Sequence, residues 1–558
     1  SGRELYIPWR LSEGAVLYRD VDDFYGPLSQ YFNAGVFKVF GPGMIVLAWV
    51  NIALFCAMAG LLYGLVRKAW GGLAALLGVG LFIAVFGFSR LTSTGGFNYA
   101  LPYSHETTHG LLVLLVLVGC AQRWLAAPAW RWSGAAGLML GLALVLKAEI
   151  ILAAVVVCGV AAVLRGLARR PLPGSSLGAF AAGAALPSLA FFAYFCAHVS
   201  PWEAFTAAGR AWFNVLGTGQ YVSEQAQLNY SGLDAAGPNL ARHLLSVLSA
   251  VGLFAVLAVL VAQMKRLPEK ARGLAAGLFV VLAACGSLLA GETWTNAGPC
   301  LLGLQLIYVG WLIFRLTREG TVASAQDVTL SVRALLVALG VTLMARMLLN
   351  GRIPQFGFYQ AAIGAVVVLA ALVAELPECV RLTLPGQRRT LRAVLVALLA
   401  GGIFSSARHG QFAYTLLQTP YGEGRDRFYS WDYQANLQEI VRLLNANPGG
   451  KLIVLPEGLM LNYLARRASP VAPFFFYSVT TAGGREAKLV EQLKADPPEW
   501  VVVLPRDLRE YGIQHYGERP GAGAELLDWV RQGYFDALTG AAPVIVPENV
   551  HLFRRRQP

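Results

Sequence analysis

Long apolar stretches separated by short polar loops run through the chain as far as residue 405. Eleven of these stretches are candidate membrane segments, and they lie at residues 43–66, 70–88, 110–125, 134–164, 177–198, 244–263, 273–290, 297–315, 330–349, 358–376 and 391–405. A helix of about 20 apolar residues spans the hydrocarbon core of a bilayer. The pattern therefore predicts a polytopic α-helical membrane protein with about 11–13 membrane segments.

The run at 134–164 differs from the others in its length and in its charges. It is too long for one span, it carries Lys147 and Glu149 near its middle, and Arg131 and Arg165 flank it. Charged side chains at the centre of a bilayer are costly. The run therefore predicts a hairpin of two short helices that returns to its own side, with Lys147 and Glu149 at the tip.

Residues 1–42, before the first long run, are polar and aromatic. Helical spacing of apolar side chains begins after Pro27, at Leu28, Tyr31, Phe32, Val36, Val39 and Phe40. Proline suits the first turn of a helix, and Asn33 and Lys38 fall off the apolar stripe. The segment predicts an outer loop that leads into an amphipathic helix at the membrane interface. Whether a first transmembrane helix precedes Ser1 is left open by the sequence.

After residue 405 the composition changes to that of a soluble domain. Two short apolar runs predict buried strands at 451–455 and 500–504, and helices are expected at 458–468, 485–495 and 524–535. Strands that alternate with helices are typical of an α/β domain. The predicted organisation is an outer loop at 1–42, a transmembrane domain at 43–405 and a C-terminal α/β domain at 406–558.

Composition and charge support a membrane protein and indicate its orientation. Hydrophobic residues make up 56% of the chain and charged residues 14%, and the formal net charge is +13. Seventeen lysines and arginines lie in the loops on the side of Arg67 and Lys68, whereas the opposite loops hold Arg90, Arg210, Arg242 and Arg352. Because basic loops stay in the cytoplasm, this excess indicates membrane topology rather than nucleic-acid binding. It predicts a bacterial inner-membrane protein whose residues 1–42 and C-terminal domain face the periplasm or exterior.

Ionisable side chains gather on this predicted outer face. They are Glu4, Asp20, Asp22, Asp23, His105, Glu106, Lys147, Glu149, Glu292, Arg346 and Arg352. Such groups at membrane depth favour a functional site. Simpler alternatives stay open: a solvated loop for the three aspartates, a helix cap for His105, a structural pair for Lys147 and Glu149, and a snorkelling side chain for Arg346. The convergence of these groups on one face is the stronger observation.

Carboxylates beside basic groups at a membrane suit sugar transfer from a lipid phosphate. Arginine or lysine would neutralise the phosphate, and a carboxylate would take the proton of the acceptor hydroxyl or hold a divalent ion. The donor would have to be lipid-linked, because nucleotide sugars are not available outside the cytoplasm.

Several segments resemble the GT-C glycosyltransferases, the superfamily that includes the protein O-mannosyltransferases and the lipid A aminoarabinose transferase. They are residues 2–9, 13–21, 25–28, 37–41, 141–149, 350–358, 455–458 and 462–463, in the order and spacing of that superfamily. The resemblance implies a membrane enzyme that uses a polyprenyl-phosphate sugar donor at an exterior site. The acceptor would be a glycan, a lipid or a protein, and no nucleic acid would take part.

In this superfamily the first outer loop supplies the catalytic acid. For this chain the resemblance therefore implies candidate catalytic acids in and near that loop, with candidate substrate-binding residues beside them. The candidate catalytic residues are Glu4, Asp20, Asp22, Asp23 and Glu106, and the candidate substrate-binding residues are His105, Lys147, Glu149, Arg346 and Arg352. A divalent cation, Mg²⁺ or Mn²⁺, remains possible, with Asp20 and Asp22 as candidate ligands.

Three other functions compete with this hypothesis. An O-antigen ligase or polymerase normally has a long outer loop rich in arginine, but the loop at 199–243 holds only Arg210 and Arg242. A transporter or flippase would show repeated halves with broken helices, and no repeat is evident. A non-catalytic scaffold would leave the charges at membrane depth unexplained.

Overall fold

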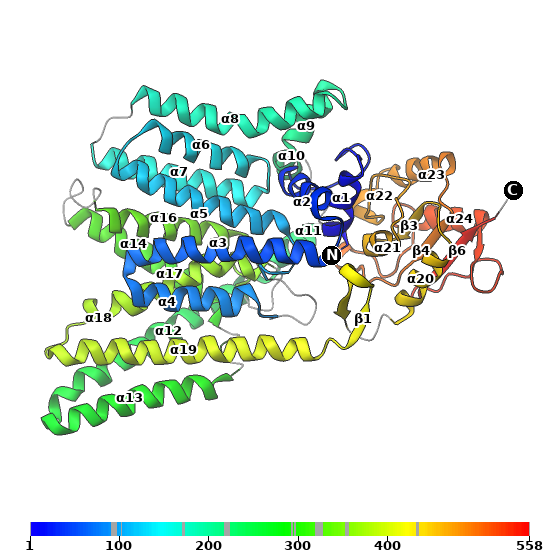
Figure 1. The fold of residues 1–558 in the computed structure, drawn as a ribbon. Coiled ribbons are helices and arrows are strands. Elements are labelled where there is room, and N and C mark those ends of the chain that lie inside the picture. The colour runs from blue at the N-terminus through cyan, green and yellow to red at the C-terminus, as the bar shows by residue number, and fades with distance from the viewer. Residues whose placement is uncertain are drawn as a thin grey trace.

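The computed structural model describes residues 2–90, 98–101, 103–169, 173–216, 224–291, 294, 297–318, 327–351, 357–430 and 435–556. A bundle of long helices forms one end of the molecule, and a domain with a small sheet forms the other (Figure 1). Helices α1 (Arg3–Ser12) and α2 (Leu28–Phe40) lie between the two.

Nine helices in the described residues are long and apolar enough to cross a membrane. They are α3 (Met44–Trp70), α5 (His105–Ala126), α7 (Ala148–Leu167), α8 (Gly174–Cys196), α12 (Ala236–Gln263), α13 (Glu269–Leu289), α14 (Cys300–Arg318), α16 (Val328–Met344) and α19 (Pro385–Thr415). Two shorter apolar segments accompany them, α4 (Gly72–Leu81) with its π-helical extension Phe82–Gly87, and α17 (Ala362–Ala374). The predicted fold class, a polytopic helical protein with a C-terminal α/β domain, is confirmed.

Shorter helices fill the connections between these segments. They are α9 (Pro201–Ala208), α10 (Arg210–Leu216) and α11 (Glu224–Ser231) between α8 and α12, and α18 (Leu376–Cys379) between α17 and α19. The last long helix, α19, has 31 residues and extends well beyond the apolar run predicted at 391–405. Hydropathy marks the apolar part of this helix but not its polar end.

The predicted hairpin is present as α6 (Trp130–Leu144) and α7, which break at residues 145–147. Helix α6 has 15 residues, but α7 has 20 and is long enough to span a bilayer by itself. Helix α6 packs closely on α8: a Cβ atom on Gly137 would lie 2.1 Å from the carbonyl oxygen of Phe180. Small residues permit this kind of close contact between membrane helices.

Helix α16 is central in the bundle, where it contacts α3, α5, α7, α14 and α17. Its contact with α17 is close, because a Cβ atom on Gly340 would lie 3.0 Å from the Cα atom of Gly364. The main hydrophobic core surrounds this helix and contains fully buried residues from α3, α5 and α7 as well. The central helices therefore form a rigid support for the loops at their ends.

Helix α2 forms where the apolar spacing after Pro27 predicts a helix, and its place at a membrane interface stays a prediction. Phe32, Val39 and Phe40 on its apolar face are exposed by 44%, 74% and 61%, as expected for side chains that contact lipid. Ser29, Gln30 and Asn33 on its other face are fully buried, and α2 packs against α5. Helix α1 was not predicted within the outer loop; Leu5, Ile7 and Trp9 bury it against the C-terminal domain.

The C-terminal domain contains a four-stranded sheet of order β3-β4-β6-β5. Strands β3 (Leu452–Leu455) and β4 (Trp500–Val503) are parallel, whereas β6 (His551–Arg555) is antiparallel to both β4 and β5 (Tyr534–Asp536). Successive side chains of β3 and β4 enter two different cores, one with α20 (Ala435–Ala446) and one with α23 (Arg485–Ala495) and α24 (Ala524–Gly533). Helices thus cover both faces, as the apolar strand sequences predict.

Some elements of this domain differ from the prediction. Helix α21 (Leu459–Leu464) is shorter than the predicted 458–468, whereas α23 matches its predicted range. The sequence did not predict α20, α22 (Ser478–Thr481), the hairpin of β1 (Thr419–Tyr421) and β2 (Phe428–Ser430), or strands β5 and β6. These strands have only three to five residues, too few for a clear alternation of apolar and polar positions.

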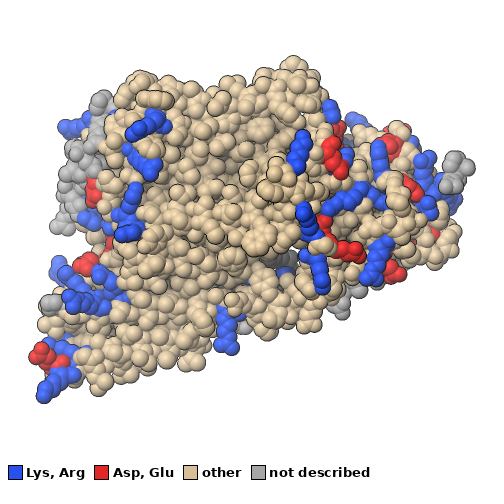
Figure 2. Space-filling model, in the orientation of Figure 1, with Lys and Arg blue, Asp and Glu red and all other residues tan. Residues whose placement is uncertain are grey.

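Charged side chains gather at the two ends of the visible face, with few between them (Figure 2). The nearly uncharged belt covers the long helices, as expected for a surface in contact with lipid.

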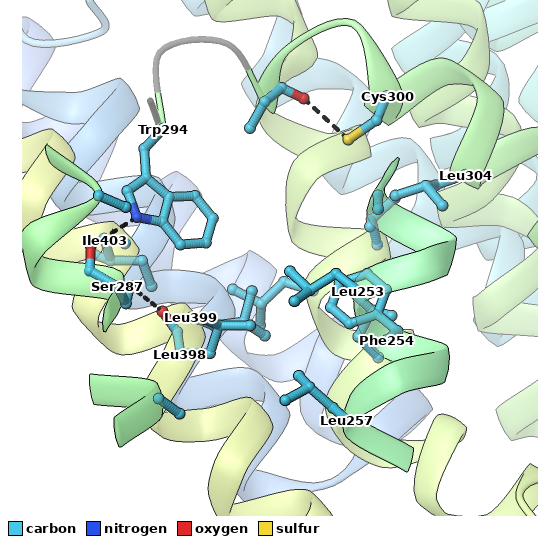
Figure 3. A pocket seen from close by; sticks show the side chains of 18 of the residues that line it. Leu253, Phe254, Leu257, Ser287, Trp294, Cys300, Leu304, Leu398, Leu399 and Ile403 are labelled. Atoms are coloured by element: carbon cyan, nitrogen blue, oxygen red, sulfur yellow. Dashed lines mark hydrogen bonds between the residues drawn. The ribbon is translucent and has the colours of Figure 1, made fainter. Parts of the chain in front are cut away.

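A cavity of about 820 Å³ lies among α12, α13, α14, α17 and α19 (Figure 3). Its few polar groups bond to the protein itself: Ser287 Oγ donates to Leu398 O at 2.6 Å, and Trp294 Nε1 donates to Ser287 O at 2.9 Å. Among the described residues that line the cavity there is no Asp, Glu, Lys, Arg or His. This described lining is mainly apolar and suits hydrocarbon.

Candidate active site

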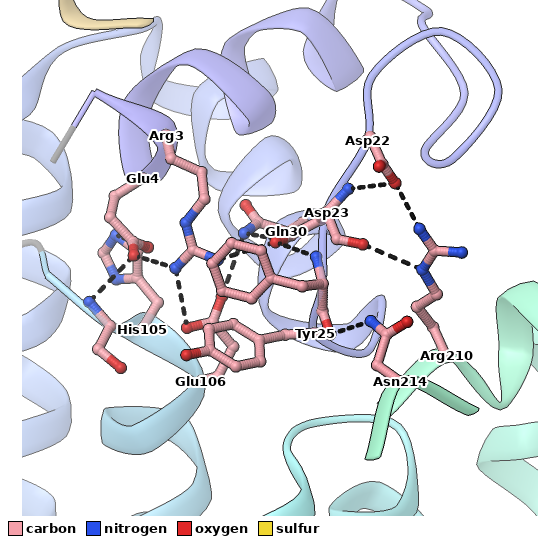
Figure 4. Close-up of polar contacts among 12 residues, drawn as sticks. Arg3, Glu4, Asp22, Asp23, Tyr25, Gln30, His105, Glu106, Arg210 and Asn214 are labelled. Atoms are coloured by element: carbon pink, nitrogen blue, oxygen red, sulfur yellow. Dashed lines mark hydrogen bonds and ion pairs between the residues drawn. The ribbon is translucent and has the colours of Figure 1, made fainter. Parts of the chain in front are cut away.

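A buried cluster of acids forms where α1, the loop at 13–27, α2 and the first turn of α5 meet (Figure 4). Glu4 comes from α1, Asp23 from the loop and Glu106 from α5, and all three have no exposed surface. The sequence separates these residues by up to about a hundred positions. The fold therefore brings together three of the five predicted catalytic acids.

One guanidinium group, that of Arg3, holds the three carboxylates. It donates to Glu4 Oε1 and, at 2.8 Å, to Asp23 Oδ1, and its Nη2 atom lies 3.6 Å from Glu106 Oε2. Gln30 Nε2 bridges the same acids, donating to Asp23 Oδ2 at 2.7 Å and to Glu106 Oε1 at 3.1 Å. A single arginine facing three acids leaves the cluster rich in acidic groups.

The electrostatic environment shifts the pKa values of two of these acids in opposite directions. Burial is the largest single influence on Glu4 and favours its neutral form, but Arg3 and the other nearby positive groups together outweigh burial and hold the pKa of Glu4 below its ordinary value. For Asp23, burial is the largest influence and raises the pKa; Arg3 opposes this effect and Glu4 adds to it. Glu4 is therefore the acid of this pair that ionises first.

Several buried polar atoms in the cluster make no hydrogen bond within the described residues. They include Glu4 Oε2, both ring nitrogens of His105, and Glu106 Oε2. The closest pair among them is His105 Nε2 and Glu4 Oε2, which are 3.8 Å apart. Buried polar atoms are normally satisfied. A site that leaves a carboxylate oxygen and an imidazole open is arranged for an additional ligand.

Asp22 and Asp20 lie at the edge of this cluster. The Asp22 carboxylate accepts from Arg210 Nη2 at 2.7 Å, and Arg210 Nε donates to the backbone carbonyl of Asp23 at 3.1 Å. Asp20 instead pairs with the exposed side chain of Arg19 at 2.7 Å and accepts from the backbone of Val16. The structure thus separates the two predicted acids: Asp22 supports the loop next to Asp23, and Asp20 faces outward.

A second group of charges occupies the tip of the α6–α7 hairpin. Glu149 pairs with Arg346 at 2.8 Å and lies 3.8 Å from the Nζ atom of Lys147, and the Lys147 ammonium lies 4.6 Å from the centre of the Tyr25 ring. Lys147 is 2% exposed. Three predicted substrate-binding residues are therefore neighbours, and Tyr25 ties them to the acidic loop.

The loop itself binds to the hairpin tip through its backbone. Gly26 N donates to Leu146 O at 2.7 Å, and Leu28 N donates to Val145 O at 3.1 Å. A Cβ atom on Gly26 would lie 2.3 Å from Val145 O, so only glycine permits this approach. The acids and the cations therefore belong to one connected structure.

Two predicted positions, Arg352 and Glu292, lie outside the described residues. The role of Arg352 in binding phosphate stays a prediction. The described residues contain no group of three or more His, Cys, Asp or Glu side chains that fits a metal ion. Asp20 and Asp22 each pair with an arginine in this structure, and a divalent cation held by these two acids stays a prediction.

The sequence reasoning did not select Arg3, Gln30 or Arg210, although all three contact the acids. Arg3 precedes Glu4 directly, and adjacent residues of a loop give no sign that their side chains converge. Gln30 carried one available signal: it is a polar residue off the apolar stripe of α2, on the face that packs against the helix contributing Glu106. Arg210 lies too far along the chain for any local pattern to connect it with Asp22.

Comparisons with known proteins identify the fold. No family model and no curated protein sequence matches the chain. The oligosaccharyltransferase of Archaeoglobus fulgidus, crystallised with zinc and sulfate, aligns over 97% of this chain and 68% of its own, with a TM-score of 0.50 and 13% identity. ArnT from Cupriavidus metallidurans bound to undecaprenyl phosphate aligns over 93% and 92%, with a TM-score of 0.37 and 13% identity.

The alignment with the oligosaccharyltransferase covers nearly the whole chain and establishes a shared fold. The chain therefore has the fold of this oligosaccharyltransferase, and the fold expected from the resemblance found in the sequence is confirmed.

Proposed function

We propose that the chain is a glycosyltransferase that moves a sugar from a polyprenyl-phosphate donor to an acceptor on the outer face of a bacterial cytoplasmic membrane. The observation that carries this proposal is the open Oε2 atom of Glu4, in a buried cluster joined by the loop at 24–28 to the Lys147 and Arg346 cations. Proton acceptor and phosphate-binding groups are the two parts that such a transfer needs.

In the proposed reaction, Glu4 Oε2 takes the proton of the acceptor hydroxyl. The hydroxyl oxygen forms the new bond to the anomeric carbon while the bond from that carbon to the phosphate oxygen breaks, which inverts the configuration. Polyprenyl phosphate leaves, and Lys147 and Arg346 stabilise its charge. Arg3 keeps Glu4 ionised, and His105 lies beside the open oxygen as a donor to the acceptor.

The other acids have supporting parts in this proposal. Asp23 and Glu106 position Arg3 and Gln30, and Asp22 fixes the loop through Arg210. Because Glu4 has no exposed surface, the covering residues have to move before an acceptor can reach it. A divalent cation is not needed for any step of this scheme.

The test is transfer of radiolabel from a panel of polyprenyl-phosphate sugars in membranes that contain the full chain. We expect one donor to be consumed by the wild type, and Glu4→Gln to lower the rate by about 10²–10⁴-fold, the usual contribution of a general base. Asp22→Asn should cause a smaller loss, because Asp22 acts on the loop.

Glu13→Gln is the matched control, since Glu13 follows α1 and makes an exposed pair with Arg10. It should retain the wild-type rate. Consumption of no donor by the wild type would contradict the proposal, as would an unchanged rate in Glu4→Gln. A transporter would instead move a donor across the membrane without cleaving it.

A further inference from the structure

A second cavity, of about 460 Å³, lies between the loop at 13–27 and the C-terminal domain. Arg19 lines it from the loop, residues 470–473 form one wall, and Arg485, Lys488 and Gln492 line it from α23. The three α23 residues are spaced three and four apart and so share one face of the helix. Small-molecule sites have volumes of about 300–1,000 Å³, which includes this one.

The charges around this cavity are predominantly positive. Three cations line it, and none of the described lining residues is acidic. The acids of α23 are engaged elsewhere: Glu486 accepts from the backbone of Gly521 and Leu526, and Glu491 pairs with Lys494 at 2.8 Å. Asp20 pairs with Arg19 at the edge of the cavity and offsets its positive charge. The cavity therefore favours an anionic ligand.

The wall opposite the cations is apolar and rigid. It includes Pro470, Val471 and Pro473, and Leu489 of α23 adds to it. Proline has little conformational freedom to lose when a ligand binds. An apolar wall beside exposed cations suits a molecule with both carbon-rich surfaces and acidic groups, as in a saccharide that carries carboxylates.

The cavity is connected directly to the acidic cluster. The backbone nitrogen of Asp22 donates to Ala472 O at 3.0 Å, and the ring of Phe24 stacks on Phe475 with centroids 6.1 Å apart. The loop that holds Asp22 and Asp23 thus lies against the wall of the cavity. Helix α23 lies beyond α1, on the side away from the long helices (Figure 1), which favours a ligand from the aqueous phase over a lipid headgroup.

We propose that this cavity binds the acidic groups of an anionic saccharide acceptor and so holds the acceptor next to the acidic cluster. The ligand's role as an acceptor rests on the proposed function, but binding of the ligand to the cavity can be tested separately. It makes Arg485 and Lys488 residues that determine specificity for the acceptor.

The experiment measures binding of two probes to the purified full chain in nanodiscs, by calorimetry at low and at physiological salt. The probes are tetragalacturonate, which carries carboxylates, and maltotetraose, a neutral oligosaccharide of the same length. We expect tetragalacturonate to bind in a salt-sensitive manner and maltotetraose to bind at least tenfold more weakly. The double variant Arg485→Glu/Lys488→Glu should lose at least tenfold in affinity for tetragalacturonate.

Lys494→Glu is the control, because Lys494 is on the same helix but outside the cavity and pairs with Glu491. It should bind tetragalacturonate as the wild type does, and melting temperatures should confirm that both variants fold. Equal binding of the two probes by the wild type, no binding of either, or unchanged affinity in the double variant would overturn the proposal.

Two further measurements separate the possible failures. If the wild type binds vesicles rich in phosphatidylglycerol and the double variant does not, while neither binds tetragalacturonate, the cavity recognises a lipid surface and the proposal is wrong. Binding of undecaprenyl phosphate, measured on the same samples, reports the proposed donor site. Its absence in the wild type would count against the proposed function and leave the result for the saccharide probes unaffected.

Discussion

Two carboxylate clusters, one partly buried and one fully buried, lie at opposite ends of the helix bundle, and they are built differently. At the end away from the C-terminal domain, Glu375 accepts from Trp70 Nε1 at 2.6 Å, from Trp311 Nε1 at 3.1 Å and from the Tyr308 hydroxyl, and it pairs with Arg333 at 3.3 Å. One acid thus has four partners. At the other end, three acids share Arg3 and leave carboxylate oxygens without a hydrogen bond.

The difference shows how structural and functional charges can be told apart. The Glu375 cluster joins α3, α14, α16 and α17 and has its donors in place, so it stabilises the bundle. The Arg3 cluster has an excess of acids and open oxygens, which cost stability unless a ligand or a reaction uses them. Burial alone would not distinguish the two clusters.

The largest expected effect is on stability at the Glu375 cluster. Glu375→Ala would remove the acceptor that Arg333 shares with Trp70, Tyr308 and Trp311, and we expect a loss of about 3–5 kcal/mol in the free energy of unfolding. Glu378→Ala is the control, because Glu378 makes surface pairs with Arg388 and Arg392 and is half exposed. Thermal unfolding in detergent measures both. A Glu375→Ala variant as stable as the wild type would contradict the claim that the Glu375 cluster stabilises the bundle.

A smaller effect is expected in donor binding at the hairpin tip. Arg346→Met removes one charge that the proposal assigns to the donor phosphate, and we expect the KM for the donor to rise about 10–100-fold, the value of a charge-assisted hydrogen bond. Arg242→Met, which removes an exposed charge elsewhere in the predicted outer loops, should leave the KM unchanged. Equal KM values in the two variants would contradict the role of Arg346.

The smallest expected effect is the change in the free energy of unfolding caused by Asp23→Asn, and the sign of this change is the informative part. The raised pKa of Asp23 means that its ionised form is destabilising in the folded state above that pKa. Stability from the protonated form is present below the unfolded pKa, about 4, and is lost as pH rises through the folded pKa. Asp23→Asn should therefore be neutral or stabilising by up to about 1 kcal/mol at pH 7, with the gain shrinking in more acidic buffer.

Thermal unfolding of Asp23→Asn as a function of pH tests this prediction. A destabilisation of several kcal/mol at neutral pH would place Asp23 with Glu375, as a structural acid. A gain at neutral pH that disappears in acid would support the excess of acidic groups around Arg3.

The sequence predicts the helical segments well, because a membrane helix needs a long apolar run and lipid leaves few alternatives. The break at Lys147 was predictable for the same reason, since charges rarely occupy the middle of a span. Short strands such as β5 and β6, and helix α1, gave no comparable signal. Their positions depend on tertiary contacts, for example the pairing of β6 with β4.

The candidate site was predicted in part. The acids of the outer face were visible as charges at membrane depth, and Glu4, Asp23 and Glu106 do converge. The sequence did not show that Asp20 turns outward to Arg19 or that Arg3 holds the cluster. Which acid pairs with which arginine depends on distances between segments far apart in the chain, and hydropathy and spacing carry no information about those distances.

The most direct test of the central claim compares Glu4→Gln with Glu375→Gln in one experiment. Donor consumption per folded molecule and melting temperature are measured on the same preparations. We predict that Glu4→Gln loses at least about a hundredfold in rate with little change in melting temperature, whereas Glu375→Gln melts earlier but keeps the wild-type rate at temperatures where it is folded. A fully active Glu4→Gln variant beside an inactive, folded Glu375→Gln variant would contradict the account.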